Sequence, residues 1–429
     1  MRWRVPTDDG TSLSPIDTAR ASDVAAIQAR TLRVLVAGQI AGSAALAAAV
    51  TVGAFVIQDI LGQETPWGGM ASATVTMGTA VTSQVLSRIM SGRTRRIGLQ
   101  TGYLLAIVGG CVAGAGAEIR SLPLFLAGLF LFGNGQASNL LSRFAATDLA
   151  EPGNRARAMS RILFASTFGA VFGPVLIQPA QAAGQAWFGW GRYTGPWVFA
   201  GVFFLTSLAN VTFRLRPDPL AVSRGVSGRA DVRTSTSTGL GTAVSDPDSR
   251  LALLSMVVSQ MTMVSVMTMT PVHLKAHGHE STSPYVISLH IAGMFAFSPL
   301  VGRLADRAGR HATILVGSLT LVAATVLAAM SGDDAGLLFP ALWLLGIGWS
   351  CGLIGGSSLL VDSVPERVRV GVQGRADLFM SLLGGTSGFL SGFIRQAVGY
   401  HVLALVGTAL AGLLAAGALW RRGTAAVAA

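Results

Sequence analysis

Residues 302–311 read Gly302-Arg303-Leu304-Ala305-Asp306-Arg307-Ala308-Gly309-Arg310-His311, a short basic segment with one acidic residue in its middle. Long apolar runs flank it on both sides, at about 284–301 and 312–331. An apolar run of about 20 residues is long enough to cross the hydrocarbon core of a bilayer as a helix. The segment therefore has the character of a tight loop that joins two membrane helices.

Two pairs of loops repeat along the chain. The segment SRIMSGRTRR at 87–96 corresponds to 302–311, with Ser91 where the later segment has Asp306. The segment DLAEP at 148–152 corresponds to DSVPE at 362–366, about 214 residues further on. Related loops at a fixed separation are typical of membrane proteins built from two fused halves.

The composition supports a membrane protein. Of the 429 residues 51% are hydrophobic and only 12% are charged, whereas soluble proteins carry about 25% charged residues. The mean hydropathy is +0.57. The apolar runs are continuous and show none of the alternation that a membrane β-barrel requires. We therefore predict an all-α polytopic membrane protein.

Twelve apolar runs are expected to form membrane helices in two groups of six. We predict a cytosolic N-terminal tail at 1–32, a first six-helix bundle at 33–214, a Ser-, Thr- and Gly-rich linker at 215–249, a second six-helix bundle at 250–420 and a C-terminal tail at 421–429. The expected helices are 33–58, 67–90, 97–117, 121–143, 160–183, 194–214, 250–273, 284–301, 312–331, 336–360, 374–395 and 400–420.

The basic residues predict the orientation. Of the 31 Lys and Arg residues, all but Arg120, Arg192, Lys275 and Arg395 fall on the face shared by both termini and the linker. Cytoplasmic loops carry an excess of Lys and Arg, so we predict a protein of the plasma (inner) membrane with both termini in the cytoplasm. The net charge of +11 is thereby explained by topology, and no nucleic-acid partner is expected.

The loop at 302–311 closely resembles the G-x-L-x-D-R-x-G-R-[KR] loop of the major facilitator superfamily, with His311 as its one departure. The resemblance covers about 33–420 and implies twelve helices in two halves, with alternating access to a site near the midplane. It also implies a cytoplasmic gate, in which acidic and basic side chains at helix ends pair in one state and separate in the other. The expected gate residues are Asp306, Arg307, Gly309, Arg310, Asp148 and Asp362.

The substrate has to be inferred from polar and soft side chains inside the helices. Met263 and Met267 stand four residues apart in the seventh helix, as do His290 and Met294 in the eighth. Residues at this spacing share one helix face. The pattern resembles that of CcoA-type copper importers within the superfamily, which implies a copper site made of these four side chains. Thioether and imidazole groups are suitable ligands for Cu(I).

Three further histidines, His273, His277 and His279, lie in the turn between these helices, where they could capture copper outside the membrane. The alternative is that the methionines only fill the core and that the substrate is organic. A flavin-type importer would then be one possibility and a drug/proton antiporter another. For the antiporter, Gly169-x-x-x-Gly173-Pro174 resembles the start of the helix-five motif, but Ile177-Gln178 replaces its closing Gly-Gly. A GxxxG can also be a plain packing contact.

A third alternative is a membrane sensor that binds a ligand without moving it. Matching halves without a sizeable soluble domain favour transport. The sequence has no nucleotide-binding loop, no HExxH and no Ser/His/Asp set with recognisable spacing, so we predict that the protein is not an enzyme. The expected partners are the lipid bilayer and a small solute or copper ion, the expected state is a monomer, and no cofactor is expected.

Overall fold

The structure is a computed structural model, and it describes residues 15–61, 70–226, 246–279 and 282–428. Within these ranges every regular element is a helix. The first half comprises α1 (Pro15–Leu61), α2 (Met70–Gly92), α3 (Arg95–Glu118), α4 (Leu122–Ala145), the 3₁₀ turn η2 (Pro152–Asn154), α5 (Arg155–Val175), α6 (Ile177–Phe188) and α7 (Thr194–Arg214).

The short helix α8 (Pro219–Val226) follows the first half, inside the predicted linker. The second half comprises α10 (Pro247–Ala276), α11 (Ser283–Phe295), α12 (Ser298–Arg307), α13 (Arg310–Met330), α14 (Ala335–Ser363) and α15 (Glu366–Ala428). The all-α fold and its two sets of six crossings agree with the sequence prediction.

Some crossings differ from the predicted runs in their ends and breaks. Helix α1 begins at Pro15, well inside the segment that we predicted as a tail. The fifth crossing is interrupted at Leu176, between α5 and α6. The eighth consists of α11 and α12, which are separated by Ala296 and Phe297. The last two crossings form the single element α15, with a kink at Gly399 (φ +88°), a backbone conformation that glycine adopts without steric cost.

Eight helices within the described residues are long and apolar enough to cross a membrane. One of them spans Val368–Arg421 and contains the kink at Gly399, so it accounts for two crossings. These eight helices thus account for nine of the twelve predicted crossings. The remaining three correspond to α1, α2 and the α5–α6 pair.

Small residues allow the helices within each half to approach closely. A Cβ on Gly128 of α4 would lie 2.3 Å from the backbone nitrogen of Ala113 on α3, and a Cβ on Gly348 of α14 would lie 2.7 Å from the Leu321 side chain on α13. Helix association in lipid depends on such close packing, because burial against lipid tails brings no hydrophobic gain. Each half is therefore a tightly packed bundle.

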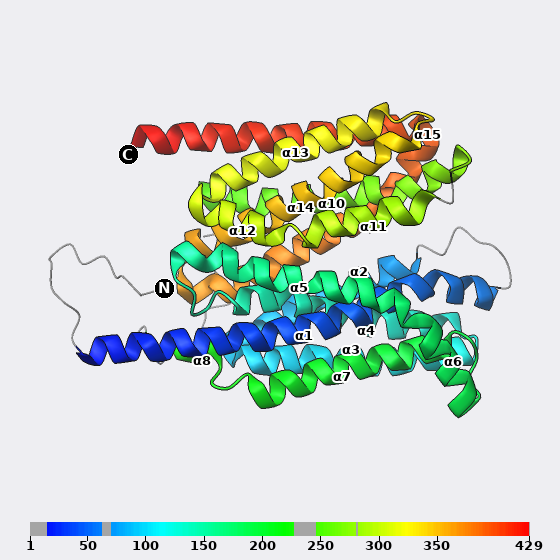
Figure 1. The fold of residues 1–429 in the computed structure, drawn as a ribbon, viewed down its shortest axis with the longest axis horizontal. Coiled ribbons are helices and arrows are strands. Elements are labelled where there is room, and N and C mark those ends of the chain that lie inside the picture. Colours follow the sequence, from blue (N-terminus) through cyan, green and yellow to red (C-terminus); the bar gives the residue numbers. More distant parts are fainter. Residues whose placement is uncertain (1–14, 62–69, 227–245, 280–281, 429) are drawn as a thin grey trace.

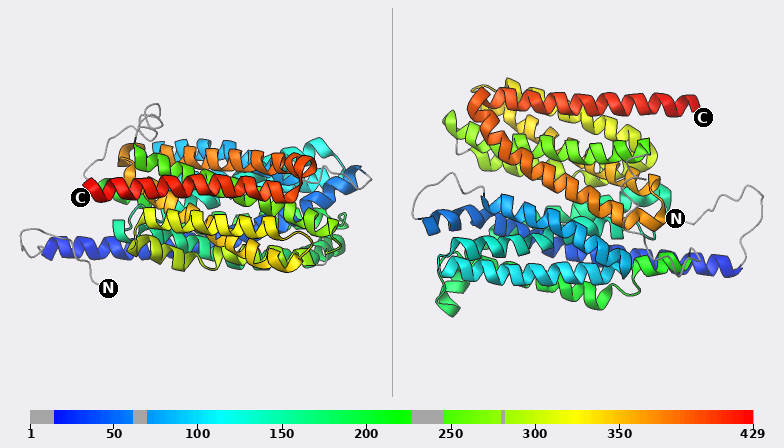
Figure 2. Two further views of the ribbon diagram at one scale, coloured as in Figure 1. Left: turned by 90° about the horizontal axis from the view of Figure 1, so that it is seen from above. Right: turned by 180° about the vertical axis from the view of Figure 1, so that it is seen from behind.

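The two halves lie side by side, and α1 begins at the same end of the molecule at which α15 ends (Figure 1). We call this the terminal end and the other the opposite end. The ribbons of the halves meet at the terminal end and lie further apart at the opposite end, as the view from behind also shows (Figure 2). The most extensive contacts between the halves are those of α2 with α15 and of α5 with α12, and α5 also contacts α11 and α14.

Candidate functional site

The polar contacts between the halves are concentrated at the terminal end. Asp306, in the last turn of α12, has a fully buried side chain. Its carboxylate accepts hydrogen bonds from the backbone N–H groups of Ala156 (3.2 Å) and Arg157 (3.0 Å) in the first turn of α5. The side chains of Arg157 and Arg310 each donate to it at 3.0 Å. Asp306 thus caps a helix of the other half, where the helix dipole favours a negative charge.

Asp362 lies beside this contact, at the end of α14. It accepts hydrogen bonds from Arg155 of the first half and, at 3.1 Å, from Arg310 of its own half. Arg310 also donates to the backbone oxygen of Pro152 at 2.6 Å. One guanidinium therefore binds two carboxylates of the second half and a carbonyl of the first.

The first half contributes a corresponding pair. Arg95, fully buried at the start of α3, binds Asp148 through two hydrogen bonds of 2.9 Å. It also donates to the side-chain oxygen of Gln373 on α15 at 3.0 Å. Burial raises the pKa of the Asp148 carboxyl and Arg95 opposes this shift. Ser91 occupies the position that corresponds to Asp306 in the repeat, and its hydroxyl donates to the Arg88 carbonyl. In the first half the carboxylate that binds the arginine is therefore supplied by Asp148.

We call these contacts the terminal layer: Asp148, Asp306 and Asp362 with Arg95, Arg155, Arg157 and Arg310. The layer brings together four of the residues that the sequence suggested for a gate. Gly309 has φ +92° and immediately precedes α13, so it permits the sharp turn of the loop. Arg307 is exposed and forms no ion pair within the described residues.

A buried ion pair lies next to the terminal layer. Arg143, in the last turn of α4, donates to the carboxylate of Asp377 on α15. The two side chains are 1% and 0% exposed. Arg143 also donates to the Ser357 hydroxyl on α14 (3.3 Å) and to the Leu140 carbonyl (2.7 Å), and its guanidinium lies 4.4 Å from the ring centroid of Phe144.

In this pair each half supplies the counter-ion of a buried charge on the other half. The second carboxylate oxygen of Asp377 is buried and has no hydrogen-bond partner among the described residues. Removing one member of a buried ion pair strands the other charge, which is strongly destabilising. Separation of the halves at this end consequently requires that both charges become hydrated or that one of them is neutralised.

Sequence reasoning did not find this pair. Arg143 is one of the basic residues that predicted the orientation, and Asp377 lies 234 residues away, in the other half. The repeat does relate Arg143 to another contact residue, Ser357. Arg143 precedes Asp148 by five residues, and Ser357 precedes Asp362 by the same interval. These two repeat-related side chains do contact each other.

The four residues suggested for copper lie in α10 and α11. His290 is fully buried. Its Nδ1 lies 2.8 Å from the backbone oxygen of Leu342 on α14, and its Nε2 is buried without a partner among the described residues. Met263 is buried, while Met267 and Met294 are half-buried against the hydrophobic core. Both helices pack on α14, and the observed hydrogen bond of His290 is to that helix.

Of the three histidines suggested for copper capture, His273, which lies inside α10, and His277, just after it, already have partners. His273 Nε2 lies 3.0 Å from the Gly332 carbonyl, and His277 Nε2 lies 3.2 Å from an oxygen of Asp333. In the described part of the chain, no three or more His, Cys, Asp and Glu side chains are grouped so that they could hold a metal ion.

Comparison with known proteins identifies relatives over most of the chain. A family model described as Major Facilitator Superfamily matches residues 34–374 and 252–428. The uncharacterized MFS-type transporter YddS of Bacillus subtilis is 36% identical over 396 residues, which cover 91% of this chain and 90% of that protein. The riboflavin transporter RfnT of Brucella anthropi is 30% identical over 317 residues, 72% of this chain and 76% of that protein.

Among solved structures, a bacterial homologue of the iron transporter ferroportin in an outward-facing state matches with a TM-score of 0.71. The match covers 91% of this chain and 98% of that one at 16% identity. At this identity the likeness supports the fold alone.

Proposed function

The chain belongs to the major facilitator superfamily of membrane transporters, and we propose that it carries a small organic solute by alternating access, with a flavin as the first candidate. A transporter of this class is not an enzyme, and its structure has to open toward one side of the membrane at a time.

The terminal layer is the main observation that supports alternating access. The interhalf ion pairs and hydrogen bonds described above all lie at the terminal end, and each half is packed as a separate bundle. Polar contacts of this kind can separate and re-form when both sides become hydrated, whereas a close-packed apolar core does not reopen in this way. The layer is therefore a gate, closed in this structure.

The distribution of arginines supports the orientation. It assigns the terminal end to the cytoplasm, so the structure corresponds to a state closed toward the cytoplasm in a protein of the plasma membrane. A single chain supplies both sides of the gate, which supports a monomer as the working unit.

Neutral polar side chains inside the helices support an uncharged, ring-containing solute. In the first half Gln39 donates to the Ser166 hydroxyl at 2.8 Å, and the buried Asn139 has an amide nitrogen without a partner among the described residues. In the second half Trp349 donates to the half-buried Gln260 at 2.7 Å. Amide and indole groups bind heteroaromatic rings through stacking and directed hydrogen bonds. The likeness to a riboflavin transporter points to the same class.

Copper uptake is the second candidate. Its support is the unpartnered Nε2 of His290, a buried neutral nitrogen that a soft metal ion could use together with the thioethers of Met263, Met267 and Met294. For such a site to form, the methionines would have to leave the apolar core against which they pack.

One experiment separates the two candidates. Uptake of labelled riboflavin and of copper is measured in cells that lack their own importers for both, with the parent and with His290→Ala expressed at equal membrane levels. Riboflavin uptake by both proteins without copper uptake supports the flavin proposal. Copper uptake that the His290→Ala variant loses supports the metal site. If the parent moves neither solute, both substrate proposals are wrong. A protein that binds riboflavin but never moves it into vesicles would refute alternating access.

A further inference from the structure

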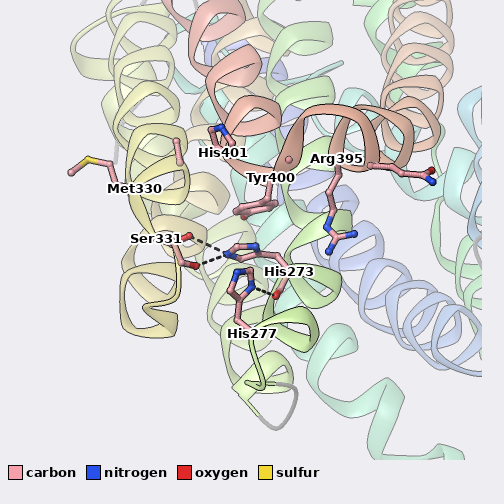
Figure 3. A pocket seen from close by; sticks show the side chains of 11 residues that line it. His273, His277, Met330, Ser331, Arg395, Tyr400 and His401 are labelled. Carbon is pink, nitrogen blue, oxygen red and sulfur yellow. Dashed lines mark hydrogen bonds between the residues drawn. The ribbon is translucent and has the colours of Figure 1, made fainter.

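A pocket lies at the opposite end of the molecule, entirely within the second half. It has a volume of about 690 Å³ and lies between the end of α10, the α13–α14 turn and the kink of α15. Figure 3 shows His273, His277, Tyr400, Arg395 and His401 arranged around it. Its size is in the range of pockets that hold small organic ligands.

The kink at Gly399 builds one wall of this pocket. It turns the chain between the last two crossings, so that Arg395 precedes the turn and Tyr400 and His401 follow it. Tyr400 is buried and stacks on His273, with ring centroids 4.3 Å apart and planes at 13°. Its hydroxyl lies 2.8 Å from that of Thr270. These contacts fix a rigid aromatic wall.

The pocket is cationic. Arg395 is half-buried, and its one hydrogen bond among those described is a long one of 3.4 Å to the Val272 carbonyl. It takes part in no ion pair within the described residues. No carboxylate side chain is among the lining residues, and Asp333 beside His277 is 93% exposed.

A guanidinium that lies beside imidazole groups, and most of whose donors have no partner among the described residues, is suited to a carboxylate. Arg binds planar oxyanions through two parallel N–H groups, and such charge-assisted bonds are stronger than neutral ones. A metal ion does not fit here, because two of the histidines already use ring nitrogens and the described residues offer no metal-binding group of His, Cys, Asp and Glu.

We propose that this pocket binds a small organic carboxylate from the side opposite the terminal gate. Arg395 anchors the carboxylate, His401 donates a further hydrogen bond at the rim, and the stacked pair of Tyr400 and His273 forms the wall behind it. The site involves one half only, so it can be occupied whether the gate is open or closed. It is distinct from the solute path and goes beyond the proposed transport.

The test is binding of citrate to the purified full-length protein in nanodiscs, measured by titration calorimetry at low salt, where screening is weak. Arg395→Gln is expected to weaken binding about tenfold or more, because it removes the charged donor. His401→Ala, an exposed position, is expected to weaken it several-fold without affecting folding. Arg192→Gln is the matched control: Arg192 is an exposed arginine just before α7, outside the pocket.

Citrate binding by the parent and by Arg192→Gln, with the expected loss in Arg395→Gln, supports the site. Equal affinity of the parent and Arg395→Gln would overturn it. So would the absence of binding by the parent up to about 10 mM, beyond which specific recognition is negligible. Neither result depends on transport, so a failure here leaves the proposed function untouched.

Discussion

Replacing Asp377 by Asn is expected to shift the protein toward a state that is open at the terminal end. The substitution keeps the size of the side chain and removes its charge. Arg143, 1% exposed in the closed state, is then left as a buried cation without a counter-ion. In an open state the same guanidinium is hydrated, so the substitution does not raise the free energy of that state.

The magnitude follows from the burial of the pair. Removing one partner of a buried ion pair costs about 3–5 kcal/mol. Asn still offers Arg143 a carbonyl acceptor, so we expect the lower end of that range, about 3 kcal/mol. At 1.4 kcal/mol per factor of ten, the ratio of open to closed molecules should rise by roughly two orders of magnitude.

Accessibility of a single cysteine reports this shift. Val370 is buried on α15 at the interhalf contact, where its carbonyl accepts a hydrogen bond from Ser87 of α2. In a background without Cys111 and Cys351, Val370→Cys should react slowly with a water-soluble maleimide in the parent and many times faster with Asp377→Asn. Combining Asp377→Asn with Arg143→Gln should restore slow labelling, because no charge is then stranded.

Asp59→Asn is the matched control. The ion pair of Asp59 with Arg120 is exposed on both sides, 50% and 60%, and exposed pairs contribute little. Its loss should leave labelling at position 370 unchanged. If Asp377→Asn is present in the membrane at the parent level and labels no faster than the parent, the buried pair does not hold the gate closed and the reasoning is wrong.

Two further predictions concern the gate and the packing. Asp306→Asn should reduce the initial uptake rate at least several-fold for any transported solute, because the amide cannot serve both Arg157 and Arg310 while capping α5; an unchanged rate would contradict a gating role. Gly346→Ala should lower the melting temperature, because its new Cβ would meet the backbone of His290 on α11, an overpacking cost of about 1–3 kcal/mol. Gly412→Ala, where no atom lies within 4 Å, should leave the melting temperature unchanged or raise it slightly; equal destabilisation by both would refute the close-approach argument.

Local features of the chain were predictable because they depend on residues close together in sequence. Long apolar runs identified the crossings, since a helix in lipid must be apolar over its length. The breaks at Leu176 and at Ala296–Phe297 were not predicted, because hydropathy averages over such short interruptions. The single element from Glu366 to Ala428 was read correctly as two crossings, although its kink is a single glycine.

For the proposed metal ligands, spacing in the sequence predicts only part of the arrangement. The intervals between Met263 and Met267 and between His290 and Met294 fix which residues share a helix face. They do not fix what that face meets, and His290 Nδ1 meets a backbone carbonyl of α14. That outcome depends on how α11 and α14 approach each other at Gly293 and Gly346.

By itself the sequence determined the membrane class, the twelve crossings, the repeat and the basic segment 302–311 that contains Asp306, because hydrophobicity and local spacing act within one helix or one turn. Only the tertiary structure decided that Arg143 and Asp377 form a buried pair and that Arg395 faces a pocket lined with histidines. Both arrangements join side chains from separate helices, and their partners are selected by the rotation and depth at which those helices pack. No single segment of the chain carries that information.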